Sequence, residues 1–265
     1  MSDSESEAEF PEIGEGFFDE DSGTWRKPVS RNEQNVYELL SESHPRIIAF
    51  QGIAEMEQEE YLVLQYHPKG DLWTYLLNND PSLSTRIHWA IEIAEGIAYL
   101  HSKSIVWADP HLRNILVTED LHVVLTDFAF SIISPDWMHR FSTMPPPIFA
   151  CPTGFWGMTP NRADIFGFGV ILFALLTRRF PWVDHLAPSL KEQLQIFTTL
   201  HEEEKWDTVG DSKLREHFGE IVEKCFKVKY MSGDGILGDL KQCFANWSED
   251  VANAEIMASR SPVQD

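Results

Sequence analysis

The segment that most constrains this chain is residues 106–131, which read VWADPHLRNILVTEDLHVVLTDFAFS. It holds Asp109, Asn114 and Asp127, and two short apolar runs separated by a Thr-Glu-Asp turn lie between Asn114 and Asp127. Apolar runs of this length around a turn predict a β-hairpin. Because an antiparallel hairpin brings its two ends together, we expect Asn114 and Asp127 to lie side by side, with Asp109 one short loop upstream.

Such a cluster would supply hard oxygen ligands and a carboxylate that can act as a base. Mg²⁺ favours one or two carboxylates together with waters and substrate phosphates, so the three side chains suit a metal–phosphate site. Asp and Asn are also common in turns, where their side chains bond to the backbone. The isolated triplet supports either interpretation, and its surroundings must decide between them.

The composition limits the class of protein. With 265 residues, 43% of them hydrophobic, the chain can form one large domain or two smaller lobes. Its 42 acidic and 21 basic residues give a net charge of -21, which disfavours binding to nucleic acid or to anionic membranes. Nine of the acidic residues fall in the first 21 positions, which contain no basic residue, so the remainder is only moderately acidic.

Cysteine usage and the chain start favour a reduced intracellular setting. The three cysteines, Cys151, Cys225 and Cys243, are far apart and form no Cys-x-x-Cys pair. The first residues lack the basic and apolar regions of a signal peptide, and the apolar run at 165–176 is too short to span a bilayer. We expect a soluble protein of the cytoplasm, with the nucleus as an open alternative.

The hydrophobic periodicity predicts a strand-rich first third and a mainly helical remainder. The helix at 162–177 is apolar on nearly all sides, as expected for a helix at the centre of a domain. Strands are predicted at 46–52, 60–66, 115–117 and 121–125, and helices at 32–41, 84–101, 162–177, 188–200, 214–226 and 235–244.

Four motifs in order resemble eukaryotic-type protein kinases. The pattern Asp-x-x-x-x-Asn, a hairpin and then Asp-Phe-Ala is similar to the catalytic loop and metal-binding motif of that superfamily. Residues 62–72 (LVLQYHPKGDL) resemble the hinge between its lobes, residues 162–182 its central helix, and residues 220–226 (EIVEKCF) a late helix. The resemblance implies a divergent, short member with a truncated N-lobe.

The implied fold is α+β and bilobal, with a small strand-rich N-lobe and a larger, mainly helical C-lobe. We expect a disordered acidic tail over residues 1–9, a reduced N-lobe over 10–66, a C-lobe over 67–248 and a flexible C-terminal tail over 249–265. The implied ligands are ATP and Mg²⁺, and the implied partner is a protein substrate.

For the catalytic loop, the resemblance implies roles residue by residue. Asp109 would accept the proton of the substrate hydroxyl. Asn114 and Asp127 would hold Mg²⁺ against the ATP phosphates, and Asp164 would brace the catalytic loop through its backbone. Phe128, the aromatic residue of the Asp-Phe-Ala motif, would give structural support.

For the nucleotide, the resemblance implies a second set of residues. Gln65 and His67 would offer hinge backbone groups to adenine, Leu64 would lie at the back of the pocket, and Asp71 would reach the ribose. Glu33, in the first predicted helix, is the best match for the glutamate that pairs with the nucleotide-binding lysine.

The catalytic loop departs from the family at three positions. Trp107 stands where histidine is usual and could serve as an apolar packing piece. Ala108 replaces an arginine and cannot grip a phosphate on the activation segment. His111 stands where a phosphate-contacting lysine is usual and carries less charge at neutral pH, or it is simply a surface loop residue.

The N-lobe departs further. Residues 13–18 (IGEGFF) resemble the opening of a glycine-rich loop, but Asp19 takes the third glycine position, so an acidic linker is an equal alternative. Nine residues between Phe18 and Pro28 leave little room for two full strands. Lys27 is the nearest candidate for the nucleotide lysine, although it lies only six residues before Glu33 and could be a solvated side chain.

Three functions remain open from the sequence. The intact base and metal ligands favour a divergent protein kinase, whose Ser/Thr preference is taken from the family because Leu-Arg-Asn at 112–114 also resembles tyrosine kinases. The altered N-lobe, Ala108 and His111 favour a pseudokinase that acts as a protein-binding scaffold. A small-molecule phosphotransferase is the third alternative, because such enzymes share the Asp-x-x-x-x-Asn pattern.

Overall fold

The computed structural model describes residues 16–40, 42–133, 146–151, 161–185, 187 and 189–260. The acidic tail expected over residues 1–9 and the first part of the glycine-rich stretch, residues 13–15, lie outside the described residues. None of the helices that are described is both long and apolar enough to cross a membrane.

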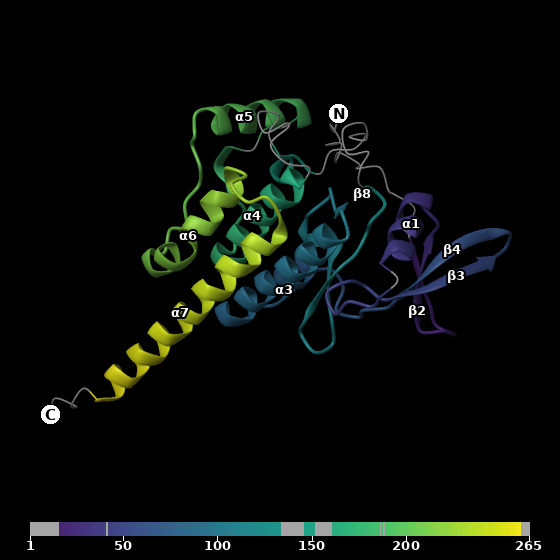
Figure 1. The fold of residues 1–265 in the computed structure, drawn as a ribbon, viewed down its shortest axis with the longest axis horizontal. Coiled ribbons are helices and arrows are strands. Elements are labelled where there is room, and N and C mark those ends of the chain that lie inside the picture. The colour runs from purple at the N-terminus through teal and green to yellow at the C-terminus, as the bar shows by residue number, and fades with distance from the viewer. Residues whose placement is uncertain are drawn as a thin grey trace, which may run out of the picture.

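The N-lobe is an antiparallel four-stranded sheet with one helix, α1 (Arg31–Leu39), beside it (Figure 1). The strand order is β1-β2-β4-β3. Two strands do fit before Glu33, because β1 has only three residues and a tight turn connects it to β2. The strands are β1 (Phe17–Asp19), β2 (Thr24–Pro28), β3 (Phe50–Met56) and β4 (Glu59–Gln65).

The strand predicted at 46–52 begins later in the structure, at Phe50. The preceding residues, which include Pro45, form turns and a single parallel bridge from Ile47 to Leu125 instead. The backbone of Arg46 and Ile48 bonds to Leu125 of the hairpin instead of to β4, so this segment packs against the C-lobe rather than extending the sheet.

The C-lobe is built from helices around the predicted hairpin. Its strands β6 (Ile115–Val117) and β7 (Val123–Leu125) pair in the register Ile115↔Leu125 and Val117↔Val123, which confirms the hairpin. The remaining elements are α2 (Leu72–Asn78), α3 (Leu83–Ser102), β5 (Ile105–Val106), η1 (Leu112–Asn114), β8 (Ile132–Ile133), η3 (Pro147–Phe149), α4 (Arg162–Thr177), η5 (Val183–His185), α5 (Leu190–Glu202), α6 (Ser212–Phe226) and α7 (Gly233–Arg260).

The last helix is longer than predicted. α7 packs on α3 and continues through most of the region expected as a tail, and its C-terminal end projects away from the body of the molecule (Figure 1).

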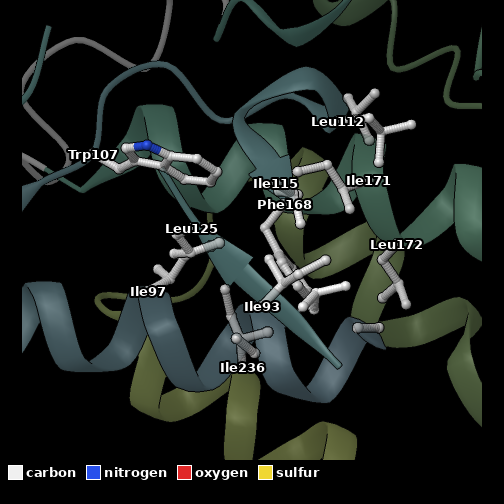
Figure 2. Packing of buried hydrophobic residues seen from close by; sticks show 14 of the residues in the cluster. Ile93, Ile97, Trp107, Leu112, Ile115, Leu125, Phe168, Ile171, Leu172 and Ile236 are labelled. Carbon is white, nitrogen blue, oxygen red and sulfur yellow. The ribbon is translucent and has the colours of Figure 1, made fainter. Parts of the chain in front are cut away.

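The centre of the C-lobe is α4, the helix predicted to be apolar on nearly all sides. Every residue from Arg162 to Leu176 is buried. Figure 2 shows residues of α3, α4 and the hairpin meeting in one cluster, among them Ile97, Leu125 and Phe168. A Cβ at Gly167 would overlap the ring of Pro110. The small residue therefore lets the loop that carries Asp109 lie directly on the central helix.

Candidate active site between the lobes

The loop between β5 and β6 brings Asp109 and Asn114 together. The Asn114 Nδ2 group donates to the Asp109 side chain (Oδ2, 3.0 Å) and to its backbone carbonyl (3.1 Å). His111 Nε2 lies 3.3 Å from the same Oδ2 atom. The other oxygen, Asp109 Oδ1, is buried and has no hydrogen-bond partner among the described residues. One acceptor of this carboxylate is thus available to a further donor.

Asp164, in the first turn of α4, holds this loop from beneath. Its Oδ1 accepts from the backbone N–H of Ala108 and its Oδ2 from that of Trp107, both at 2.7 Å. His101 Nε2 lies 2.9 Å from Oδ2 as well. The Asp164 side chain is fully buried, and hydrogen bonds to it from several donors offset the cost of that burial. This is the backbone bracing expected of Asp164.

Trp107 does more than fill space. Its side chain is fully buried, and the indole Nε1–H donates to the carbonyls of Thr126 (3.1 Å) and Asp127 (3.3 Å). The Trp107 carbonyl in turn accepts from Ser131 Oγ at 3.1 Å. The indole therefore ties the Asp109 loop to the segment that carries Asp127, a contact that the sequence reading, which considered packing alone, missed.

Lys27 meets two carboxylates from distant parts of the chain. Its Nζ lies 2.8 Å from Glu33 Oε2 and 2.9 Å from Asp127 Oδ1. Burial lowers the pKa of Lys27, but the charges of Glu33 and Asp127 outweigh it and the pKa is raised overall. Burial, aided by Asp127, raises the pKa of Glu33 against the pull of Lys27. The lysine is thus a half-buried cation shared by two acids rather than a solvated side chain.

Phe128 is held against α1. Its backbone N–H donates to Glu33 Oε1 at 3.3 Å, and its buried ring meets Tyr37 edge to face at 5.3 Å. Tyr37 also stacks on Phe50 at 4.9 Å. This column of aromatic rings connects the Asp-Phe-Ala motif to the sheet of the N-lobe and gives Phe128 the supporting position expected of it.

Asn32 makes contacts with the Asp127 segment that were not predicted from the sequence. Its Nδ2 donates to three backbone carbonyls of one segment, those of Phe128 (3.4 Å), Ala129 (3.0 Å) and Ser131 (2.8 Å). Its position directly before Glu33 was the only sequence signal. Through Asn32 and Glu33, one turn of α1 fixes the backbone that follows Asp127.

Two residues of the site have left-handed backbone, namely Ala108 (φ 70°) and Asp127 (φ 58°). Non-glycine residues adopt this conformation rarely and at a cost of about 1–2 kcal/mol. Such strain is often found at functional sites, and here it falls directly before Asp109 and at Asp127 itself.

A cavity of about 360 Å³ lies between the lobes. Seven of the predicted site residues line it, whereas the other six, Asp109 and Glu33 among them, do not. Those seven are Lys27, Leu64, Gln65, His67, Asp71, Asn114 and Asp127. The hinge residues, the lysine and both expected metal ligands thus border one space.

Two residues of this cavity have further features. The Asp71 carboxylate accepts from Thr74 N (2.9 Å) and Thr74 Oγ1 (2.7 Å), so it already caps the start of α2. His67 is buried, and its Nε2 has no hydrogen-bond partner in the described part of the chain. Burial lowers the pKa of His67, although Glu119 acts in the opposite direction.

Trp25, in β2, forms part of the cavity wall. Its indole lines the space together with Gly16, and its ring is nearly parallel to that of Tyr66 at 6.3 Å. A Cβ at Gly16 would overlap the Trp25 indole, so the chain before β1 lies directly against that ring. No sequence pattern predicted a large aromatic ring at this point.

A family model described as protein kinase domain matches residues 19–232. The chain is 32% identical over 157 residues to the cAMP-dependent protein kinase catalytic subunit PRKX of Homo sapiens, covering 58% of this chain and 42% of that protein. It is 30% identical over 166 residues to the serine/threonine-protein kinase kin-29 of Caenorhabditis briggsae, covering 61% and 20%.

A longer match, 25% identical over 193 residues, is to the RGS domain-containing serine/threonine-protein kinase A of Dictyostelium discoideum, covering 70% of this chain and 16% of that protein. The chain spans between 13% and 58% of the length of the curated relatives that it matches.

Proposed function

Because this chain belongs to the protein kinase domain family, we propose that it transfers the γ-phosphate of Mg·ATP to a serine or threonine hydroxyl of a protein. The observation that carries the proposal is the meeting of Lys27 Nζ with Glu33 Oε2 and Asp127 Oδ1, at 2.8 and 2.9 Å. Asp127 lies 100 positions from Lys27, so the fold has to assemble this cluster from both lobes.

The residues present fit Mg·ATP. Asp127 and Asn114 line the interlobe cavity and carry the oxygen ligands that Mg²⁺ prefers. Leu64, Gln65 and His67 supply a hinge wall on the same cavity, whose volume of about 360 Å³ lies in the range of small-molecule sites. When bound, Mg·ATP would supply the phosphoryl group and neutralise its developing charge.

Each side chain then has a defined task. Lys27 would donate to phosphate oxygens while Glu33 keeps its ammonium in place. Asp109 would accept the proton of the substrate hydroxyl at Oδ1, the buried oxygen that has no partner among the described residues. Asn114 fixes the orientation of Asp109 through its other oxygen. Most of the rate enhancement in such a site comes from positioning and charge.

The position of His111 and the names of the curated relatives both support a hydroxyl group of a protein as the substrate. The His111 ring lies 3.3 Å from Asp109 Oδ2 and can donate near the reacting oxygen in place of the usual lysine. The curated relatives above are named serine/threonine-protein kinases, which supports serine or threonine over tyrosine. The acidic chain and its reduced cysteines support a protein substrate in the cytoplasm rather than a nucleic acid or membrane partner.

One observation favours a second candidate, a scaffold without efficient transfer. Trp25 and Gly16 line the cavity together with Asp127, whose carboxylate is already paired with Lys27. Mg²⁺ would have to compete with the Lys27 ammonium for that carboxylate. The small-molecule phosphotransferase alternative has no counterpart in the family match.

Calorimetric titration with ATP, with and without Mg²⁺, tests the proposal. We expect Mg²⁺-dependent binding that Asp127→Asn weakens at least tenfold, because one carboxylate ligand is lost. Asp184→Asn is the matched control, because Asp184 lies in η5 and is exposed. If neither the parent chain nor Asp127→Asn binds nucleotide, the kinase proposal fails and the scaffold takes its place.

A further inference from the structure

A second and larger cavity, of about 1090 Å³, lies against the hinge. It shares Ile48, Gln65, Tyr66 and His67 with the interlobe cavity but otherwise has different walls. Those walls are the segment that connects α1 to β3 and the turn between β6 and β7, residues 118–122. We call this space the hinge groove. None of the roles proposed above uses it.

One side of the hinge groove is apolar. Ile47 and Ile48 come from the connecting segment, Val124 from the hairpin, and Leu40 from the end of α1, and all four side chains are buried. Ala49 lies on the same wall and is exposed. Aliphatic side chains of a ligand could therefore be buried here without displacing charged groups.

The opposite side of the groove is acidic. Glu119 and Asp120, at the hairpin turn, are exposed, and neither forms an ion pair or a hydrogen bond with any described residue. Glu42 is also on the rim and has only a distant partner, Lys103, at 3.7 Å. The available charges of the groove are thus negative.

The arginine in the groove does not offset these charges. Arg46 is engaged by Glu92, at 3.0 Å from its Nη2, and by Glu95, at 3.0 Å from its Nε. Both of these acids lie on α3. The charge of the Arg46 guanidinium is therefore balanced by these two carboxylates. An anion that enters the groove would meet the acidic rim rather than a free cation.

His67 adds a polar atom without a partner to the wall between the two cavities. The residue is 6% exposed, and its Nε2 is buried without a hydrogen bond to any described residue. Buried polar atoms are usually hydrogen-bonded. The His67 ring lies where the two cavities adjoin.

We propose that the hinge groove binds an extended segment of a partner protein in which lysine or arginine stands next to aliphatic residues. The basic groups would face Glu119 and Asp120, and the aliphatic ones would lie on Ile47, Ile48 and Val124. The volume exceeds that of an ordinary small-molecule site, which favours a peptide. The proposal rests on the fold and the charges, and it holds whether or not the chain transfers phosphate.

Fluorescence polarisation with two pools of labelled octapeptides tests this. The pools are identical except for a central Lys-Leu-Lys or Glu-Leu-Glu. We expect the basic pool to bind, and the double change Glu119→Gln and Asp120→Asn to weaken its binding roughly 2- to 30-fold, the range for two exposed ion pairs. Ala49→Trp should weaken binding as well, because the indole would fill the apolar side of the groove.

The matched control is the double change Glu57→Gln and Glu59→Gln, which removes the same charge from two exposed positions, one in the β3–β4 turn and one at the start of β4, neither of which lines the groove. It should alter affinity less than twofold. The proposal is overturned if both pools bind alike, or if neither pool binds at a protein concentration of about 1 mM. It is also overturned if the control variant weakens binding as much as the groove variant does. Circular dichroism establishes that each variant is folded.

Discussion

Asp164 in the C-lobe and Glu33 in the N-lobe are both fully buried carboxylates, but their surroundings differ. Asp164 accepts hydrogen bonds from two backbone N–H groups at 2.7 Å and has a histidine nitrogen at 2.9 Å. Among the described residues, Glu33 pairs with one cation, Lys27, which also serves Asp127, and its other oxygen accepts a longer hydrogen bond from Phe128 N–H at 3.3 Å. Asp164 is held mainly by short bonds from the backbone, while the charge of Glu33 is balanced by a lysine that it shares.

This difference indicates what each lobe contributes. Backbone donors cannot leave, so the C-lobe holds the loop of Asp109 in position by itself. The N-lobe cluster has two carboxylates for one ammonium, and it is held partly by contacts with the Asp127 segment. We therefore expect the C-lobe half of the site to be rigid without nucleotide and the N-lobe half to respond to charge.

The largest effect should come from removing the C-lobe anchor. Asp164→Ala leaves the N–H groups of Trp107 and Ala108 buried without acceptors, which should lower the free energy of unfolding by about 3–5 kcal/mol. Urea denaturation followed by fluorescence measures this. Asp184→Ala, at an exposed position, is the control and should change it by less than about 0.5 kcal/mol. A loss under 1 kcal/mol for Asp164→Ala would contradict the comparison.

Removing the lysine of the N-lobe cluster should lower the free energy of unfolding by less, and a second substitution should recover part of that loss. Lys27→Met leaves two carboxylates without their cation, which should lower the free energy of unfolding by about 2–4 kcal/mol. Adding Glu33→Gln removes one of the two stranded charges and should recover about half of that loss. If the double variant is as unstable as the sum of its parts, the two side chains do not act as a pair.

The pH dependence of stability gives a finer test of Glu33. Burial raises its pKa above the ordinary value of 4.5, so the folded state favours the protonated form. The contribution of this carboxyl to stability is then full below pH 4.5 and is lost as the pH rises toward the folded pKa. Glu33→Gln cannot titrate. We expect the parent chain to lose stability relative to Glu33→Gln as the pH rises above 4.5, by at most about 1.4 kcal/mol per pH unit, in urea titrations. The opposite slope would contradict a raised pKa.

The C-lobe half of the site could be predicted from the sequence because its geometry is local. Asn114 and Asp127 flank one hairpin, and the pairing of Ile115 with Leu125 places their neighbours together. No long-range information was needed beyond the recognition that the apolar runs form strands. Asp164 could be placed only through the resemblance, since nothing near it in the sequence indicates that it reaches the backbone of the catalytic loop.

Lys27 could not be placed with the same certainty. Its position depends on the pairing of β2 with β4, in which Lys27 lies opposite Leu62, and on a turn short enough to leave room for β1. The six-residue separation of Lys27 from Glu33 is short for a strand, a turn and a helix. In the structure, only two residues join β2 to α1. The three hydrogen bonds that Asn32 donates to distant carbonyls likewise depend on tertiary packing.

The Trp107 indole gives the smallest predicted effect. Trp107→Phe keeps a ring in the buried site but removes the N–H that donates to Thr126 and Asp127. Two hydrogen bonds that share one donor are worth about 1–1.5 kcal/mol, beyond the packing lost with the smaller ring. Trp206→Phe provides the matched control, because the Trp206 Nε1 is buried and has no partner among the described residues. In urea denaturation, Trp107→Phe should therefore cost about 1 kcal/mol more than Trp206→Phe. Equal losses would mean that Trp107 acts by packing alone, and that the bond from Ser131 Oγ to the Trp107 carbonyl is the side-chain hydrogen bond that holds the two segments together.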